Sequence, residues 1–255
     1  WIPGATYGKT HPEFFAEIGG KRIDPSGGKS ALLLSEQLCT TNPALRAEIV
    51  KNMVEYCGKH PEIKTISLVP NDGFGWCECA ACSRLTASRG PGGPYAVSAH
   101  VPRADRLYQD LVADVFRQLR RRQPDLRLTF EAYINYCAPA PGFRLAPGLG
   151  VHFAPYWRCI NHALDDPRCP TNAAYWRDLK AWVAARGGGE VNVYEYFMGV
   201  NFYVSLPMVH HALVFREAAA YARLGVDGLM TQFQFGHWTA YGLNYCLMAK
   251  ACWPN

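Results

Sequence analysis

Residues 191–196 read VNVYEY, an apolar and aromatic run with the length and composition of a β-strand. A segment with helical spacing of apolar residues follows at 207–224, and Gly225 comes directly after it, where helices commonly end. The next strand-like run, GLMTQF, occupies residues 228–233. A strand, a helix and another strand in succession predict two parallel strands joined by a helical crossover.

The same succession recurs along the chain. Further strands are predicted at residues 31–38, 65–69, 126–133 and 149–153, and further helices at 43–57, 103–122, 173–186 and 238–251. One helix start is clear, because Asn42 can cap a helix that has Pro43 in its first turn. The repeated pattern predicts an α/β protein with a parallel sheet.

The glycines do not indicate a nucleotide-binding fold. The glycine turns at 73–75 and 187–189 precede no helix that could cradle a phosphate, and no dinucleotide or P-loop fingerprint is present. Six strands of this kind favour a (β/α)8-type TIM barrel, which has eight strands and is therefore expected to be incomplete at its N-terminus. We expect residues 1–255 to form a single barrel domain, excised from a longer protein that begins before Trp1, and to use no organic cofactor.

The composition narrows the class of protein. The 255 residues are 49% hydrophobic and 13% aromatic, which is too apolar for a disordered segment. The net charge of +5 is mild and forms no basic stripe, so nucleic acid is not an expected partner. No run approaches the roughly 18 apolar residues of a membrane-spanning helix. The oligomeric state is left open.

Three carboxylates lie at the predicted ends of strands, where parallel barrels carry their catalytic groups. They are Asp72, Glu131 and Glu195. Cleavage of a glycosidic bond requires one carboxylic acid and one carboxylate. Asp72 and Glu195 form the leading pair, and burial between Tyr194 and Tyr196 is expected to raise the pKa of Glu195 towards general-acid use. Which carboxylate acts as the acid is left open.

The same carboxylates also have structural interpretations. An Asp in the sequence Asn-Asp-Gly often only forms a turn. A Glu in a strand, such as Glu131 or Glu195, can simply pair with an Arg of the barrel wall.

Polar and aromatic side chains near the strand ends are candidates for holding a sugar ring. Arg158 suits an acidic sugar, because a guanidinium can bind a carboxylate through two hydrogen bonds. The alternative for a histidine at a strand end is a structural role, in which its hydrogen bonds are satisfied within the fold. The predicted substrate-binding residues are Asn71, Tyr133, His152, Arg158, His162, Tyr196, Gln232 and Trp238.

Three cysteines lie close together shortly after Asp72: Cys77, Cys79 and Cys82. This spacing favours a tetrahedral zinc site, for which Cys39 is the first choice of fourth ligand. The other candidates for that position are Cys159, Cys169, His100 and His162. Such a zinc ion would be structural, since four protein ligands leave no open position. The alternatives are a disulfide with one free thiol, and a redox-active motif.

Several motifs together resemble the bacterial domain-of-unknown-function family 4838. They are HPEFF at 11–15 with GKR at 20–22, QLCTTNP at 37–43, PNDG at 70–73 with the three cysteines that follow, and LNY at 243–245 leading to WP at 253–254. The resemblance implies a glycoside-hydrolase-like (β/α) barrel, distantly similar to α-glucuronidases and β-hexosaminidases. It also implies export, to the periplasm, the cell surface or the medium, and a preceding β-rich domain.

Three functional hypotheses follow from these features. The first is a glycoside hydrolase that acts on a polysaccharide or oligosaccharide through paired carboxylates. The second is a non-catalytic carbohydrate-binding barrel with a structural zinc loop. The third is a zinc-dependent hydrolase, which requires an open position on the metal.

Overall fold

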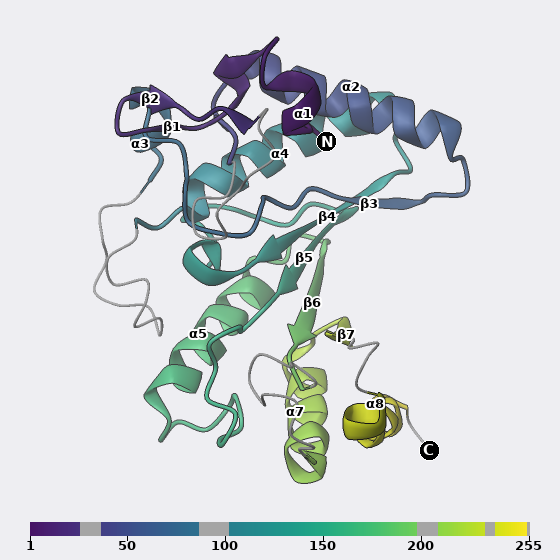
Figure 1. Cartoon of the computed structure of the whole chain (residues 1–255). Coiled ribbons are helices and arrows are strands. Elements are labelled where there is room, and N and C mark those ends of the chain that lie inside the picture. Colours follow the sequence, from purple (N-terminus) through teal and green to yellow (C-terminus); the bar gives the residue numbers. More distant parts are fainter. Residues whose placement is uncertain (26–36, 87–101, 198–208, 233–237, 254–255) are drawn as a thin grey trace. The chain divides into compact units, whose positions relative to one another are not determined.

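The computed structural model describes residues 1–25, 37–86, 102–197, 209–232 and 238–253 (Figure 1). The chain divides into two compact units. The first comprises Trp1–Pro91, Val97–Phe130 and Pro139–Phe143, and the second comprises Gly92–Ala96, Glu131–Ala138 and Arg144–Asn255.

The first unit is mostly helical. It contains, in chain order, α1 (Gly4–Tyr7), the 3-10 turn η1 (Pro12–Phe14), β1 (Glu17–Ile18), β2 (Lys21–Arg22), α2 (Pro43–Lys59), β3 (Thr65–Ser67), α3 (Ala80–Ser83) and α4 (Asp105–Arg122). β1 and β2 form a short antiparallel hairpin. The Asn42 side chain caps α2, accepting hydrogen bonds from the backbone amides of Ala44 and Leu45. β3 pairs in parallel with β4 (Arg127–Ala132), whose first four residues belong to this unit.

The core of the first unit lies between its two long helices. α2 packs against α4. Leu45, Ile49 and Met53 of α2 are fully buried, as are Leu107 and Val112 of α4. Leu45, Ile49 and Met53 recur at intervals of four residues, so α2 presents one apolar side to the core.

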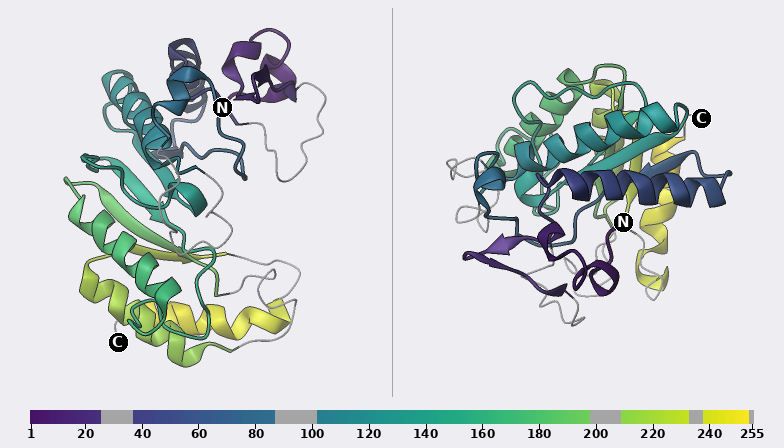
Figure 2. Two further views of the ribbon diagram at one scale, coloured as in Figure 1. Left: turned by 90° about the vertical axis from the view of Figure 1, so that its left-hand side faces the viewer. Right: turned by 90° about the horizontal axis from the view of Figure 1, so that it is seen from above.

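The second unit carries most of the parallel sheet. It contains the 3-10 turn η4 (Ile134–Tyr136), β5 (Leu149–Phe153), α5 (Pro170–Ala184), β6 (Glu190–Glu195), α7 (His211–Leu224), β7 (Gly228–Thr231) and α8 (Trp238–Cys252). β5 pairs with β6 and β6 with β7, both in parallel. α7 packs against α8 (Figure 2). Gly225 ends α7 in the left-handed conformation with φ +89°, which a residue without Cβ adopts readily.

Buried and partly exposed residues alternate strictly along β6, and this pattern shows which side chains face the core. Val191, Val193 and Glu195 are buried, whereas Asn192 and Tyr194 between them are partly exposed. Because successive side chains of a strand point to opposite faces, Glu195 shares a face with the valines. On this face α7 contributes Tyr221, which hydrogen-bonds to Glu195. Tyr194 lies on the opposite face.

The predicted TIM barrel is wrong. The described residues contain five parallel strands in the order β3-β4-β5-β6-β7, rather than the eight of a closed barrel. The described residues near the N-terminus form α1, η1 and the antiparallel hairpin. The strand predicted at 31–38 lies mostly outside the described residues, and Leu38 makes an isolated antiparallel bridge with Phe15. The α/β class is correct.

Among the helices that the structure describes, none combines the length and the apolar character needed to cross a membrane.

Candidate functional site

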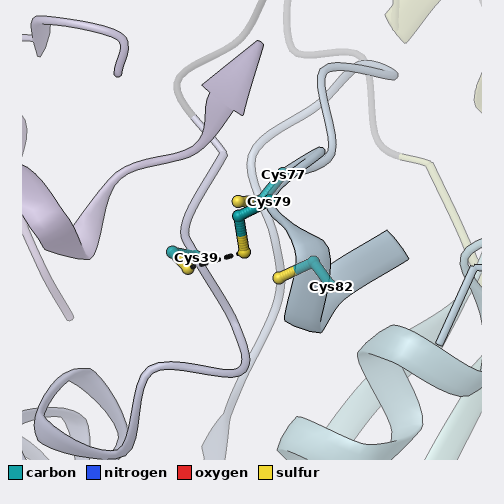
Figure 3. Close-up of side chains that lie close together, drawn as sticks. All are labelled: Cys39, Cys77, Cys79 and Cys82. Carbon is teal, nitrogen blue, oxygen red and sulfur yellow. Dashed lines mark hydrogen bonds between the residues drawn. The ribbon is translucent and has the colours of Figure 1, made fainter. Parts of the chain in front are cut away.

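Four cysteine side chains of the first unit meet in one cluster (Figure 3). Cys39 follows the bridge formed by Leu38, Cys77 and Cys79 lie in the loop after β3, and Cys82 lies in α3. Their sulfur atoms all lie within 4.8 Å of one another, and those of Cys39 and Cys79 are 3.7 Å apart. The structure therefore brings together the four ligands that the sequence predicted, in a cluster that could hold a metal ion.

Neighbouring groups hold two of the sulfurs in place. The backbone amide of Glu17 donates to Sγ of Cys77 over 3.3 Å, and Nη1 of Arg22 lies 3.7 Å from the same sulfur. The hydroxyl of Thr41 lies 3.1 Å from Sγ of Cys82. The β1–β2 hairpin thus supplies donors and one positive charge to the cluster, which favours the thiolate forms that bind metals.

The thiols of the cluster shift one another's pKa values. Hydrogen bonds with Cys77 and Cys82 lower the pKa of Cys39, and the hydrogen bond with Cys39 raises the pKa of Cys77. The cysteines of the structure are all free thiols. Four thiols without a disulfide, three of them buried and Cys79 partly exposed, match the donors of a closed tetrahedral zinc site.

The other candidates for the fourth ligand lie elsewhere. Cys159, His162 and Cys169 belong to the second unit and form a group of their own. His100 lies outside the described residues.

Asp72 and Asn71 belong to the first unit. Asp72 is exposed in the loop after β3, and Gly73 beside it has φ +123°, as a tight turn requires. The carbonyl of Asn71 accepts a hydrogen bond from the side-chain amide of Gln37. Asn71 also lines a pocket of this unit, together with Gln37 and Trp76. The geometry is compatible with both the turn and the catalytic interpretation of Asp72.

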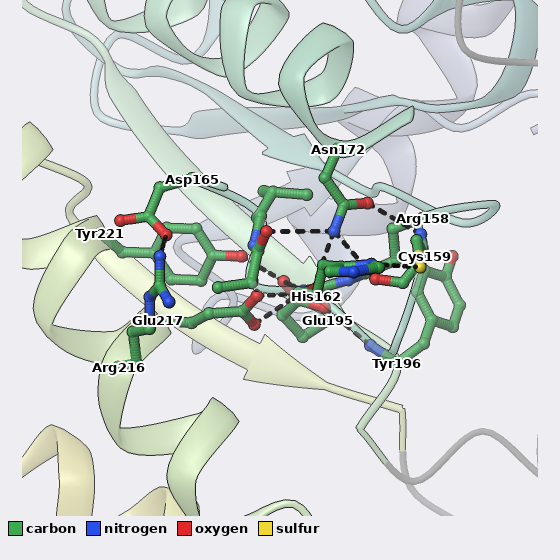
Figure 4. Close-up of polar contacts among 12 residues, drawn as sticks. Arg158, Cys159, His162, Asp165, Asn172, Glu195, Tyr196, Arg216, Glu217 and Tyr221 are labelled. Carbon is green, nitrogen blue, oxygen red and sulfur yellow. Dashed lines mark hydrogen bonds and ion pairs between the residues drawn. The ribbon is translucent and has the colours of Figure 1, made fainter. Parts of the chain in front are cut away.

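Glu195 belongs to the second unit and takes part in a buried polar network (Figure 4). Nη1 of Arg158 lies 2.8 Å from Oε1 of Glu195 and 2.7 Å from Oε2 of Glu217. The hydroxyl of Tyr221 donates to the same Oε1 of Glu195. The side chains of Glu195 and Arg158 are only 0% and 2% exposed. Neither group can therefore reach a substrate without rearrangement of the core.

The charges of this network compensate one another. Burial acts to lower the pKa of Arg158, but the carboxylates of Glu195 and Glu217 raise it well above its ordinary value. Burial raises the pKa of Glu217 to about 7, with a further contribution from Glu195. This arrangement favours the structural interpretation of Glu195, as the partner of an arginine. It also replaces the predicted role of Arg158, whose guanidinium binds two carboxylates of the protein.

The other face of the sheet carries a carboxylate among tyrosines. Glu131, near the end of β4, is partly exposed between buried neighbours. Burial and the charge of Glu131 raise the pKa of Tyr194, and burial, Tyr133 and Glu131 raise the pKa of Tyr196. Ring centroids are 5.5 Å apart for Tyr133 and Tyr156, 5.1 Å for Tyr156 and Tyr196, and 5.2 Å for Tyr196 and Tyr194. We call Glu131 and these four tyrosines the tyrosine site.

His152 lies on the same side of the sheet as Tyr194. It pairs in register with Asn192 of β6, two residues before Tyr194, so the three side chains share a face. Burial lowers the pKa of His152, which keeps the imidazole neutral near pH 7. A neutral imidazole can both donate and accept a hydrogen bond beside the tyrosine site.

The remaining predicted substrate residues lie in three different settings. Nδ1 of the exposed His162 is 3.1 Å from Sγ of Cys159. The carbonyl of Gln232 accepts a hydrogen bond from the hydroxyl of Tyr245. Trp238 is 54% exposed and stacks on Tyr245 with 5.4 Å between ring centroids.

A comparison with protein families decides where the chain belongs. The family model described as Domain of unknown function (DUF4838) matches residues 1–255. The chain belongs to the DUF4838 family. No curated protein and no solved structure matches it. The resemblance inferred from the motifs is therefore confirmed at the level of the family.

Sequence reasoning missed the partners that bury Glu195 in the DUF4838 chain. Glu217 and Tyr221 lie on α7 and had no recognisable motif. One signal was available, because Val191 and Val193 alternate with Asn192 in the sequence. That alternation places Glu195 on the apolar face of β6.

Proposed function

We propose that this DUF4838 chain is a glycoside hydrolase whose tyrosine site binds a sugar ring and whose Glu131 takes part in bond cleavage. The observation that carries this proposal is the position of Glu131. It is a partly exposed carboxylate among four tyrosines at the carboxyl ends of neighbouring parallel strands. Ligand sites of α/β sheets lie at these strand ends.

The chemistry of the site suits a sugar. Aromatic faces pack against the C–H faces of sugar rings, while phenol hydroxyls and the His152 imidazole offer hydrogen bonds to sugar hydroxyls. Bond cleavage needs a carboxylic acid at the glycosidic oxygen and a second carboxylate for the nucleophile or for water. Glu131 supplies one of these groups. A catalytic role of Asp72, which belongs to the first unit, stays a prediction from the sequence.

The proposal is tested by a screen of glycan hydrolysis with matched variants. Glu131→Gln should lower turnover by roughly 10²–10⁴-fold, the usual contribution of an acid–base group, without loss of folding. Glu190→Gln is the control, because Glu190 lies at the amino end of β6, opposite to the strand ends of the tyrosine site, and should leave turnover unchanged. Equal turnover of the wild type and Glu131→Gln on every substrate cleaved would refute the assignment.

A non-catalytic carbohydrate-binding module is the second candidate. The burial of Glu195 supports it, because one of the two carboxylates first expected to act on substrate is used within the fold. This alternative predicts glycan binding without turnover, weakened by Tyr194→Ala in isothermal titration calorimetry. Measurable hydrolysis that Glu131→Gln abolishes excludes it.

We also propose that the four-cysteine cluster holds structural zinc. Four thiolates satisfy the tetrahedral preference of zinc and leave no position for water, so the cluster is not suited to hydrolysis at the metal. Metal analysis should find zinc in the purified chain, and Cys82→Ser should lower both the zinc content and the thermal midpoint. Full zinc content in Cys82→Ser would contradict this assignment. Export, which the family resemblance implies, stays a prediction.

A further inference from the structure

A second group of metal-binding side chains lies in the second unit, apart from the four-cysteine cluster. It consists of Cys159, His162 and Cys169, whose ligand atoms all lie within 4.8 Å of one another. Sγ of Cys159 is 3.1 Å from Nδ1 of His162 (Figure 4). Thiolate and imidazole are ligands that zinc and similar divalent ions prefer.

Buried polar groups hold the backbone of this segment. Asn172 is fully buried, accepts a hydrogen bond from the amide of Cys159 over 2.8 Å and donates to the carbonyl of His162 over 2.9 Å. Nη2 of Arg158 donates to the same carbonyl of His162 over 3.0 Å. Arg158 is itself fixed by its two carboxylate partners. The fold thus already orders the loop, so that metal binding would cost little conformational entropy.

The third ligand has a favourable electrostatic position. Cys169 is the N-cap residue of α5, a helix of 15 residues. The amide groups at the start of a helix carry partial positive charge. The side chain of Cys169 is buried, that of Cys159 is half-buried, and that of His162 is exposed. The group therefore opens towards solvent on the side of His162.

We propose that Cys159, His162 and Cys169 bind a second divalent transition-metal ion, with zinc as the expected occupant and one coordination position open to an exogenous ligand. Three protein ligands with water in the fourth position are typical of zinc sites that exchange ligands. The site thus differs from the closed four-cysteine cluster in both ligand number and accessibility. It stands independently of the proposed glycoside hydrolase activity.

The first test is zinc content, measured by mass spectrometry of the full chain purified under reducing conditions and equilibrated with zinc. The wild type should retain about two zinc ions and the double variant Cys159→Ser/Cys169→Ser about one, as expected for two independent sites. Cys246→Ser is the control, because Cys246 is exposed on α8 and belongs to neither group. The same zinc content in the wild type and the double variant would overturn the proposal.

The open position is tested with cobalt in place of zinc. Added cyanide should shift the visible spectrum of the cobalt-loaded wild type. It should cause no such shift in the spectrum of cobalt-loaded His162→Ala. His162 is exposed, so this variant also tests the site if the double variant fails to fold. A wild-type cobalt spectrum that cyanide does not change, or a fully reduced chain that takes up no zinc at Cys159 and Cys169, would overturn the proposal.

Discussion

Replacement of Arg158 by methionine tests whether the Arg158 network stabilises the second unit. Arg158→Met keeps most of the side-chain volume but removes the only cation that contacts Glu195 and Glu217 in the structure's described part. Both carboxylates are at most 1% exposed, so water cannot replace the guanidinium. Breaking a buried pair by removing one partner costs about 3–5 kcal/mol, and we expect a loss of this size in the free energy of unfolding at pH 8.

The loss should depend on pH in a defined direction. Burial raises the pKa of Glu217, and the loss of Arg158 removes the cation that opposes this shift. The protonated form of Glu217 is then favoured in the folded state, so stability is present at low pH and is lost as the pH rises through the folded pKa. The difference in the free energy of unfolding between the wild type and Arg158→Met should therefore become smaller from pH 8 to pH 5. Urea unfolding followed by circular dichroism measures this difference.

A matched control separates burial from charge. Arg177 lies on α5 and pairs with Asp178 at 3.4 Å, but its side chain is 66% exposed. Arg177→Met should lower the free energy of unfolding by less than about 1 kcal/mol, as surface ion pairs do. A loss below about 1 kcal/mol for Arg158→Met, or a loss that does not change with pH, would refute the account of a stabilising buried network.

Three further predictions address separate features. Glu217 has a pKa of about 7 in the folded protein against an ordinary 4.5, so wild-type stability should fall by up to about 3 kcal/mol as the pH rises from 5 to 8; Glu217→Gln should remove that slope in urea unfolding. Asn42→Ala removes the cap of α2 and should lower the free energy of unfolding by about 1 kcal/mol. A thermal midpoint equal to that of the wild type would contradict a stabilising role of this cap. Gly225→Ala places a side chain at φ +89° and should destabilise by about 1 kcal/mol in the same assay, while any gain in stability would be inconsistent with this geometry.

Local elements were predictable because their signals lie within a few residues. The strand predicted at 149–153 matches β5, and the helix predicted at 43–57 matches α2 with two more residues at its end. Asn42 with Pro43 set one of these boundaries, and Gly225 set the end of α7. Such caps act through hydrogen bonds and backbone angles of the residues themselves.

The number of strands was not predictable in the same way. A strand pairs with residues far along the chain, and no local signal states how many partners a sheet has. No barrel strand was predicted within the N-terminal residues 1–25. In the structure they form short turns and a hairpin whose residues contact the Cys77 loop.

The candidate site was predicted in part. The spacing of Cys77, Cys79 and Cys82 was enough to predict the cluster, and Cys39 was the right first choice for the fourth position. The choice of Glu195 over Glu131 followed from its tyrosine neighbours in sequence. Because strand neighbours point to opposite faces, those tyrosines lie away from Glu195.

The central claim is that Glu131, and not Glu195, meets the substrate. Its most direct test is turnover of one cleaved glycan by the wild type, Glu131→Gln and Glu195→Gln, each measured at a temperature where circular dichroism shows the variant folded. The account predicts that Glu131→Gln loses roughly 10²–10⁴-fold in turnover while folded Glu195→Gln retains the wild-type rate. Unchanged turnover in Glu131→Gln, with loss in folded Glu195→Gln, would contradict it.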